Sequence, residues 1–136
     1  MTIFEKIILK EIPSHIVYED DLVIAFLDIS QATKGHTLVV PKTAYKDIFE
    51  IPDNILSHLI VVAKKLAKAI DKAFAPKGIN LLNNNKEAAG QTVFHFHIHI
   101  IPRYSSNDVS FAFTNNMNNL SSNDYKERAS AICAAL

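Results

Sequence analysis

The sequence predicts an α+β fold in which an antiparallel sheet of about five strands carries helices on one face. Short apolar segments follow one another with brief turns over residues 16–41, which favours an antiparallel meander. A long amphipathic segment then occupies residues 52–74, and two further apolar segments lie at residues 79–82 and 93–101. At 136 residues, the chain fits one domain with a sizeable core.

The first 41 residues are expected to hold one short helix and three strands. Apolar residues at positions 3, 4, 7 and 8 of Thr2–Lys10 have the spacing of a short amphipathic helix, and Pro13 follows it. Polar residues separate the segments that follow, with Asp20 and Asp21 at the first turn and Ser30–Gly35 at the second. The strands are predicted at Ile16–Glu19, Leu22–Ile29 and His36–Pro41.

The clearest predicted helix begins at Pro52 and carries one apolar stripe as far as Phe74. Pro76-Lys77-Gly78 is expected to end it. Beyond it the sequence predicts strands at Ile79–Leu82 and Val93–Ile101, separated by a polar loop at Asn83–Gly90. An irregular stretch at Ser105–Asn119 and a terminal helix at Ser122–Leu136 follow, with Ser121 or Ser122 as the helix cap.

The bulk composition excludes several classes of protein. Fourteen basic residues balance fourteen acidic ones, so no general attraction to nucleic acid or to an anionic membrane is expected. The single cysteine, Cys133, rules out an internal disulfide framework and suits a reducing compartment. Charges at Glu5, Lys6 and Lys10 interrupt any signal-peptide core, and no apolar run approaches a membrane span. We therefore expect a cytoplasmic protein.

Three histidines stand at alternate positions, His95, His97 and His99, within a segment predicted to be a strand. Successive side chains of a strand point to opposite faces, so the three imidazoles should line one side. The apolar residues between and after them, Phe96, Ile98 and Ile100, should line the other. This pattern predicts a row of groups that titrate near neutral pH.

Three interpretations of the histidine row are possible. The imidazoles could simply face solvent, although such strand faces usually vary their polar residues. They could bind a metal together with His36, but the strand holds no acid and Cys133 is remote. They could attack a phosphorylated substrate, because imidazole is a good nucleophile at neutral pH and then a good leaving group. We favour the third, since Gly90 and hydrogen-bonding side chains precede the row, namely Asn83, Asn84, Gln91 and Thr92.

The segment from Gly90 to Arg103 (GQTVFHFHIHIIPR) resembles the signature of the histidine-triad family, in which three histidines alternate with apolar residues. Ile3–Pro13 is similar to the N-terminal helix of that family, and Val23–Lys42 to its nucleotide-binding strands. The resemblance implies a single domain over residues 1–136, with a core at about 3–112 and an extension at 113–136 that carries the terminal helix. It also implies a homodimer whose sheet is extended by dimerisation.

By this resemblance, His97 is the nucleophile that attacks the α-phosphorus of a nucleoside 5′-phosphate derivative and forms a nucleotidyl-histidine intermediate. His99 is expected to contact the phosphate, His95 to brace the site, and His36 to support the triad from the adjacent strand. The remaining phosphate-side residues implied by the family pattern are Gln91, Thr92 and Asn84.

The resemblance also implies a nucleoside pocket. Asp28 matches the acid that accepts hydrogen bonds from ribose hydroxyls, although it could instead cap the turn at Ser30. Five apolar residues match the wall around the purine, although each could be plain core: Ile3, Phe4, Ile7, Phe26 and Ile29. His15 and His58 lie outside every motif and are expected to be structural or surface residues.

Two departures from the family pattern bear on function. Thr2–Glu5 replaces the Cys-x-x-Cys pair of many bacterial members, so a structural zinc ion is not expected. The chain lacks the tryptophan-containing tail of one phosphoramidase branch, which leaves the leaving group open. We expect a hydrolase of adenosine phosphoramidate or of dinucleoside polyphosphates that needs no cofactor. A nucleotide-binding adaptor with slow incidental hydrolysis and a metal-dependent enzyme are the alternatives, and the exposed edge strand Ile79–Leu82 would explain the dimer.

Overall fold

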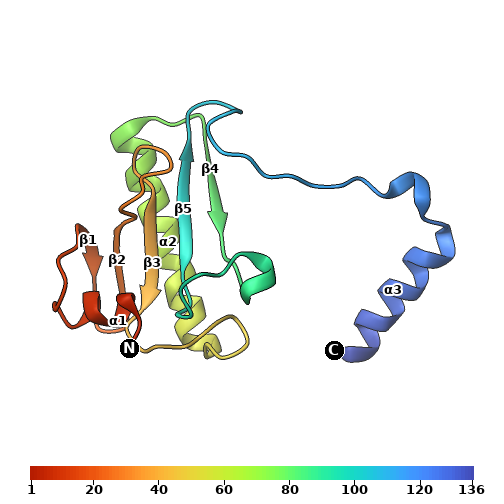
Figure 1. The fold of residues 1–136 in the computed structure, drawn as a ribbon, viewed down its shortest axis with the longest axis horizontal. Coiled ribbons are helices and arrows are strands. Elements are labelled where there is room, and N and C mark those ends of the chain that lie inside the picture. The colour runs from red at the N-terminus through yellow and green to blue at the C-terminus, as the bar shows by residue number, and fades with distance from the viewer.

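The computed structural model describes residues 1–136 and contains one five-stranded antiparallel sheet with the strand order β1-β2-β3-β5-β4 (Figure 1). The predicted α+β class and the antiparallel sheet are confirmed. The strands are β1 (Ile16–Glu19), β2 (Val23–Leu27), β3 (Thr37–Pro41), β4 (Gly78–Leu82) and β5 (Ile98–Arg103). The α-helices are α1 (Ile3–Ile8), α2 (Asp53–Phe74) and α3 (Ser122–Ala135), and two short 3-10 turns lie at Glu87–Ala89 and Met117–Asn119.

The helices cover both faces of the sheet, so the expectation that they share one face is wrong. The apolar stripe of α2 packs on one face, where Leu59, Leu66 and Phe96 belong to the larger core. The short helix α1 packs on the opposite face, where Phe4 and Ile7 meet Phe26 in a smaller core. Because successive strand residues alternate between faces, apolar residues on both sides of β2 and β3 can be buried.

The histidine strand begins later than predicted, at Ile98 instead of Val93. Pro41 is the last residue of β3 and has no amide hydrogen, and its carbonyl accepts a hydrogen bond from His95 Nε2 at 2.7 Å. The Phe96 amide donates to Tyr45 O instead of to β3. The alternation nevertheless holds, because Phe96, Ile98 and Ile100 all enter the α2 core as predicted.

The long helix α2 follows its predicted bounds closely. Pro52 occupies the N-cap, where a missing amide hydrogen costs nothing, and the helix ends at Phe74. Ala75 adopts a left-handed conformation with φ 49° as the C-cap, before the Pro76–Gly78 segment. The helix thereby returns the chain to β4, the outermost strand, and leaves room for β5 beside β3.

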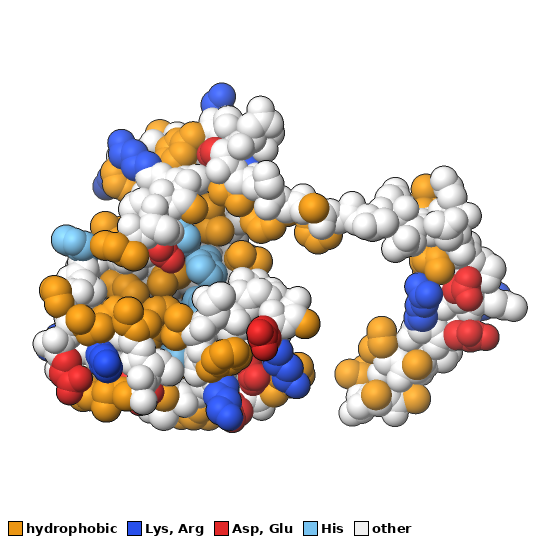
Figure 2. All heavy atoms as spheres, in the orientation of Figure 1, with side chains coloured by type: hydrophobic (Ala, Val, Ile, Leu, Met, Phe, Trp, Pro, Cys, Tyr) orange, Lys and Arg blue, Asp and Glu red, His pale blue; other side chains and the backbone are white.

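The last part of the chain forms an arm that extends away from the domain (Figures 1 and 2). Residues 112–121 lead to α3, in which Ser121 forms the predicted cap by accepting from the Asp124 amide. No residue of α3 is buried. Each helix of the structure is too short or too polar to span a lipid bilayer. The arm is thus ordered as a helix without contributing to either core.

Candidate active site

A cavity of about 630 Å³ opens on the α1 face of the sheet, a size that suits a small organic ligand. Figure 2 shows histidines in a hollow surrounded by hydrophobic side chains. Most of the predicted site residues line this cavity: His36, His97, His99, Thr92, Asp28, Asn84, Ile3, Phe4, Ile7, Phe26 and Ile29. His95 and Gln91 do not line the cavity, and both side chains are buried elsewhere in the domain.

The His97 ring is held with one nitrogen bonded to the protein and the other free. Nδ1 donates to the backbone carbonyl of His95 at 2.7 Å, and a carbonyl can only accept, so Nδ1 carries the proton. Nε2 has no hydrogen-bond partner in the protein, and the ring lines the cavity. The Phe4 ring meets the imidazole edge-on at a centroid distance of 5.1 Å. In its neutral form, His97 therefore presents an unprotonated Nε2 atom toward any ligand.

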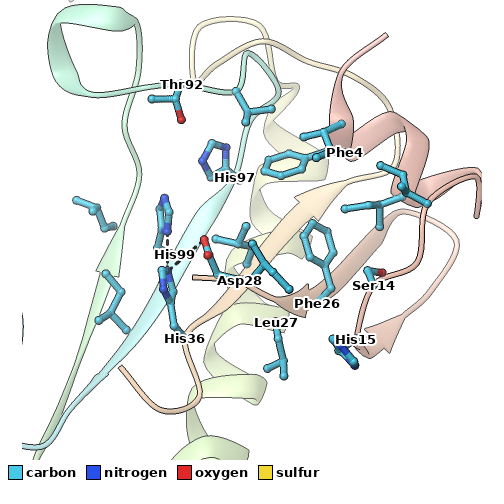
Figure 3. Close-up of a pocket in the computed structure, with 18 of the residues that line it drawn as sticks. Phe4, Ser14, His15, Phe26, Leu27, Asp28, His36, Thr92, His97 and His99 are labelled. Atoms are coloured by element: carbon cyan, nitrogen blue, oxygen red, sulfur yellow. Dashed lines mark hydrogen bonds and ion pairs between the residues drawn. The ribbon is translucent and has the colours of Figure 1, made fainter. Parts of the chain in front are cut away.

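The His99 ring has the opposite proton arrangement, and His36 sets it. The Ala32 amide donates to His36 Nδ1 at 3.3 Å, so the neutral His36 ring carries its proton on Nε2. That nitrogen lies 2.9 Å from His99 Nδ1, which must then accept (Figure 3). The neutral His99 ring is left with its proton on Nε2, which has no partner in the protein. His99 consequently offers a donor to the cavity, whereas His97 offers an acceptor.

The turn between β2 and β3 keeps His36 in this state, and Gln31 holds the turn together. Its amide nitrogen donates to the carbonyls of Asp28 and His36 at 2.8 and 2.7 Å. Its side-chain oxygen accepts from the Gly35 amide at 2.9 Å. Gln31 itself has a left-handed backbone, with φ 44°, and precedes the Ala32 amide that contacts His36. Only the position of Gln31 in a polar turn hinted at this role in the sequence.

Burial lowers the pKa of all four histidines in this region below the ordinary value of 6.5. Desolvation is the largest cause in each case, because it disfavours the charged ring. For His99 the neighbouring His97 and His36 add to it, and its pKa falls to about 4. Burial thus favours the uncharged form of these rings near neutral pH.

Asp28 is placed immediately after β2, where one of its oxygens caps the turn and the other is free of that cap. Its Oδ1 accepts from the amide and the hydroxyl of Ser30 at 2.8 and 2.6 Å, which caps the turn. Its Oδ2 faces the cavity side and lies 3.8 Å from His36 Nε2 (Figure 3). Burial raises the pKa of Asp28, but the Ser30 hydrogen bonds and the nearby histidines outweigh this and lower it overall. One oxygen of an ionised carboxylate thus remains for a ligand hydroxyl.

The apolar wall of the cavity comes from α1 and β2. Phe4 packs edge-on against Phe26 at a centroid distance of 5.5 Å, and both rings are buried, as is Ile7. Ile3 and Ile29 lie at the exposed rim, with Ile29 91% exposed. The capping box of Thr2 and Glu5 fixes the start of α1 and so the position of Phe4.

The loop from Asn83 to Thr92 divides its polar residues between the cavity and the fold. Asn84 and Thr92 line the cavity, and a side chain at Gly90, where φ is 94°, would meet Asn84. Asn83 instead donates to the His97 carbonyl at 3.0 Å. Gln91 is buried and bonds only to the backbone of Lys46, Lys86 and Val93, so its side chain braces the loop.

His95 lies behind the cavity. It is fully buried, donates from Nε2 to Pro41 O, and has Thr2 Oγ1 at 3.5 Å from Nδ1. Its ring packs against Phe4 at a centroid distance of 5.7 Å. His95 therefore links α1 to β3, and its carbonyl orients His97.

Ligand atoms of Asp28, His36 and His99 lie within 4.8 Å of one another, which raises the possibility of a metal site. A cation on His36 Nε2 would force that ring's proton to Nδ1, against the Ala32 amide hydrogen. The cluster therefore fits a metal ion poorly.

The two histidines outside every motif have different surroundings. His58 bonds to Asp20 at 2.6 Å and is structural, as expected. His15 lines the cavity with Ser14, which the sequence did not indicate.

Comparison with known proteins shows a family and a fold that this chain shares. The model for the HIT domain family matches residues 9–106. "Protein hit" of Bacillus subtilis is 56% identical over 106 residues, which cover 78% of this chain and 73% of that protein. The purine nucleoside phosphoramidase of Escherichia coli is 40% identical over 103 residues, covering 74% and 85% of the two chains. The crystal structure of a HIT family protein from Bacillus anthracis is 50% identical, with a TM-score of 0.93 and coverage of 98% and 96%.

Proposed function

Because the chain belongs to the HIT domain family, we propose that it is a nucleotide hydrolase acting at the α-phosphorus of nucleoside 5′-phosphate derivatives. The observation that carries the proposal is the pair of cavity histidines with opposite free groups. His97 Nε2 has an unshared electron pair, and His99 Nε2 carries a proton. A phosphoryl centre between them would meet a nucleophile on one side and a hydrogen-bond donor on the other.

In the first step, the electron pair of His97 Nε2 forms a bond to the α-phosphorus. The bond from phosphorus to the leaving group breaks, and that group departs with the electron pair and takes a proton from solvent. His97 Nδ1 keeps its proton, and its hydrogen bond to the His95 carbonyl stabilises the positive charge that develops on the ring. His99 and Thr92 donate to phosphate oxygens, which lowers the energy of the transition state.

In the second step, water attacks the phosphorus of the nucleotidyl-His97 intermediate. The phosphorus–nitrogen bond breaks, its electron pair returns to His97 Nε2, and the nucleoside monophosphate is released while a proton passes to solvent. The proposed chemistry requires no metal ion, and we expect the rate to be unchanged after exhaustive chelation.

The rest of the cavity suits a purine nucleoside monophosphate. The rings of Phe4 and Phe26 can pack against a base, and the free Oδ2 of Asp28 can accept from ribose hydroxyls. No lysine or arginine lines the cavity. Neutral donors can hold an α-phosphate, but they compensate a polyphosphate chain poorly. We therefore place adenosine phosphoramidate ahead of dinucleoside polyphosphates as a substrate.

A substrate panel tests the proposal. Initial rates would be measured for adenosine phosphoramidate, guanosine phosphoramidate, diadenosine polyphosphates and nucleotide sugars, each with and without chelator. We expect the purine phosphoramidates to give the highest kcat/KM. Rates at trace level for every compound, together with tight binding of adenosine monophosphate, would contradict the hydrolase and support a nucleotide-binding adaptor.

A variant at His97 supplies the control for that panel. His97 is only 5% exposed and packs against Phe4, so its replacement should not be reduced to a methyl group. His97→Asn keeps a polar side chain and should bind adenosine monophosphate while losing turnover by about 1,000-fold or more. His58 bonds to Asp20 and does not line the cavity, so His58→Asn should retain the rate.

A further inference from the structure

Two polar side chains of the cavity, those of Ser14 and His15, have no part in the proposed chemistry. Both line the cavity and directly precede β1. The chain has six histidines, and the other five each hydrogen-bond to a protein group, whereas the His15 ring bonds to none. The Ser14 hydroxyl likewise has no partner in the protein, although the residue is half-buried. The donors and acceptors of both side chains are therefore available to a ligand.

Pairing between β1 and β2 fixes the position of these two residues. Ile16 is opposite Phe26, and the Leu27 amide donates to the carbonyl of His15 at 3.0 Å. The antiparallel register therefore continues beyond the start of β1. Because alternate residues of a strand share a face, Ser14 lies on the same face as Ile16 and Phe26. The Phe26 ring on that face forms part of the cavity wall.

The residues along the cavity are arranged in an order that matches the parts of a nucleotide. In Figure 3, His99 lies at one end, Asp28 comes next, and Phe26 lies between Asp28 and Ser14. A phosphate at the histidines and a ribose at Asp28 would direct the base across Phe26. The base edge farthest from the ribose, which carries the 6-position of a purine, would then face Ser14 and His15.

The end of the cavity beyond Asp28 otherwise presents apolar side chains. Ile7, Ile12 and Phe26 belong to the smaller core and line the cavity there. A polar base edge among such side chains would lose water without gaining a hydrogen bond, which is costly. A serine hydroxyl can donate and accept, and a neutral imidazole has one donor and one acceptor. Ser14 and His15 can therefore compensate the loss of water at this edge.

We propose that Ser14 and His15 are specificity-determining residues that hydrogen-bond to the 6-substituent of a purine base and to the ring nitrogen beside it. The proposal rests on the proposed function, because it needs a nucleotide in the cavity, and it adds which edge of the base is recognised. Since both side chains can donate and accept, they suit the 6-amino group of adenine and the 6-oxo group of guanine. They disfavour a purine that has only hydrogen at position 6.

Binding of nucleoside monophosphates tests the proposal without requiring turnover. Calorimetric titration would compare adenosine monophosphate with purine riboside 5′-monophosphate, which has hydrogen in place of the 6-amino group. We expect the parent protein to bind adenosine monophosphate about fivefold or more tightly, the usual contribution of one hydrogen bond. The ratio of the two affinities is the readout, because both nucleotides share the ribose and phosphate. A general loosening of the site would weaken both equally and leave the ratio unchanged.

Three variants locate the source of the preference. Ser14→Ala and His15→Ala should each lower the affinity ratio, and the double variant should bring it to about one. Val17→Ala, on β1 and outside the cavity, is the control and should keep the parent ratio.

The outcomes separate this proposal from the hydrolase itself. Equal affinities of the parent protein for the two nucleotides, or a ratio that survives in the double variant, would overturn the assignment of Ser14 and His15 and leave the hydrolase standing. A preference that is lost in the double variant, in a protein that turns over no phosphoramidate, would support the assignment and contradict the hydrolase.

Discussion

At the residue scale, His97 and His99 differ by the position of one proton. The His95 carbonyl places that proton on Nδ1 of His97, while the chain from Ala32 through His36 places it on Nε2 of His99. Neither partner contact is visible in the spacing of the three histidines. The sequence pattern predicted which rings come together, but only the backbone path of the β2–β3 turn decides which nitrogen of each ring is free.

The pH dependence of the reaction follows from these buried rings. Desolvation lowers the pKa of His97 below 6.5, so the nucleophile keeps its free electron pair to a lower pH than an exposed histidine would. We expect the acid limb of kcat/KM to be centred below about pH 6.5. Rates measured with a phosphoramidate whose own titration is known would check this. An acid limb centred above 6.5 would show that the nucleophile is solvated.

At the element scale, the turn between β2 and β3 controls the chemistry of β5. Gln31→Ala removes three hydrogen bonds and frees the Ala32 amide from its fixed direction. We expect kcat/KM to fall by about 10–100-fold, the usual cost of losing a group that orients a reacting side chain. Nitrogen NMR of the histidines should show a changed tautomer at His36. Lys34→Ala, in the same turn, should leave both the rate and the tautomer unchanged, and equal losses in the two variants would contradict this role.

The short helix α1 is expected to act mainly on binding. Phe4→Ala removes a ring that contacts Phe26 and His97, so KM should rise about tenfold or more while kcat falls less. Calorimetric titration with adenosine monophosphate should show the same weakening. Leu9→Ala, just beyond the same helix and 56% exposed, is the control and should bind normally. If both variants lost the same affinity, α1 would be stabilising the fold generally instead of contacting the base.

The local sequence pattern predicted most helices and strands, because each of them has a strong signal in its own residues. The stripe of α2, the Ser121 cap and the alternation at Phe96, Ile98 and Ile100 all depend on neighbouring residues. The start of β5 could not be predicted in this way, because it depends on Pro41, far away in the chain. Placement of α1 on the second face depends likewise on the apolar residues that β2 and β3 present there.

Among the site residues, those with alternating spacing were the easiest to predict. Asn84 reaches the cavity, whereas the adjacent Asn83 supports the His97 carbonyl, and no local property of two asparagines distinguishes them. Gln91 bonds to backbone groups of its own loop and of Lys46. These partners are set by tertiary packing, so the local sequence could not predict them. Their hydrogen-bonding side chains and their place before the histidine row singled these residues out in the sequence. The structure separates the one that lines the cavity from those that brace it.

At the scale of the whole molecule, the buried histidines couple stability to pH. His36, His95, His97 and His99 have lower pKa values in the folded chain than the 6.5 expected when unfolded. At a pH between the folded and unfolded pKa values, the unfolded chain binds more protons than the folded chain. The contribution of these histidines to the free energy of unfolding is therefore fully present above about pH 6.5, and it is lost as the pH falls toward the folded pKa values.

Urea unfolding at pH 7, 6 and 5 measures this coupling. We expect the free energy of unfolding to fall by about 1 kcal/mol or more over that range, a figure that allows for solvent screening of the partly exposed His99 ring. His99→Asn should show a weaker dependence than the parent chain. A free energy that stayed constant or rose on acidification would mean that these rings are already charged in the folded protein.

The most direct measurement is the identity of the atom that carries the nucleotide during turnover. Adenosine phosphoramidate would be mixed with the enzyme, quenched in alkali within the first turnovers to protect a phosphorus–nitrogen bond, and the chain digested for mass spectrometry. We predict an adenylyl group on His97 and none in His97→Asn. An adenylyl group on His99, His95 or His36, or steady turnover in His97→Asn, would contradict the assignment of His97 Nε2 as the nucleophile.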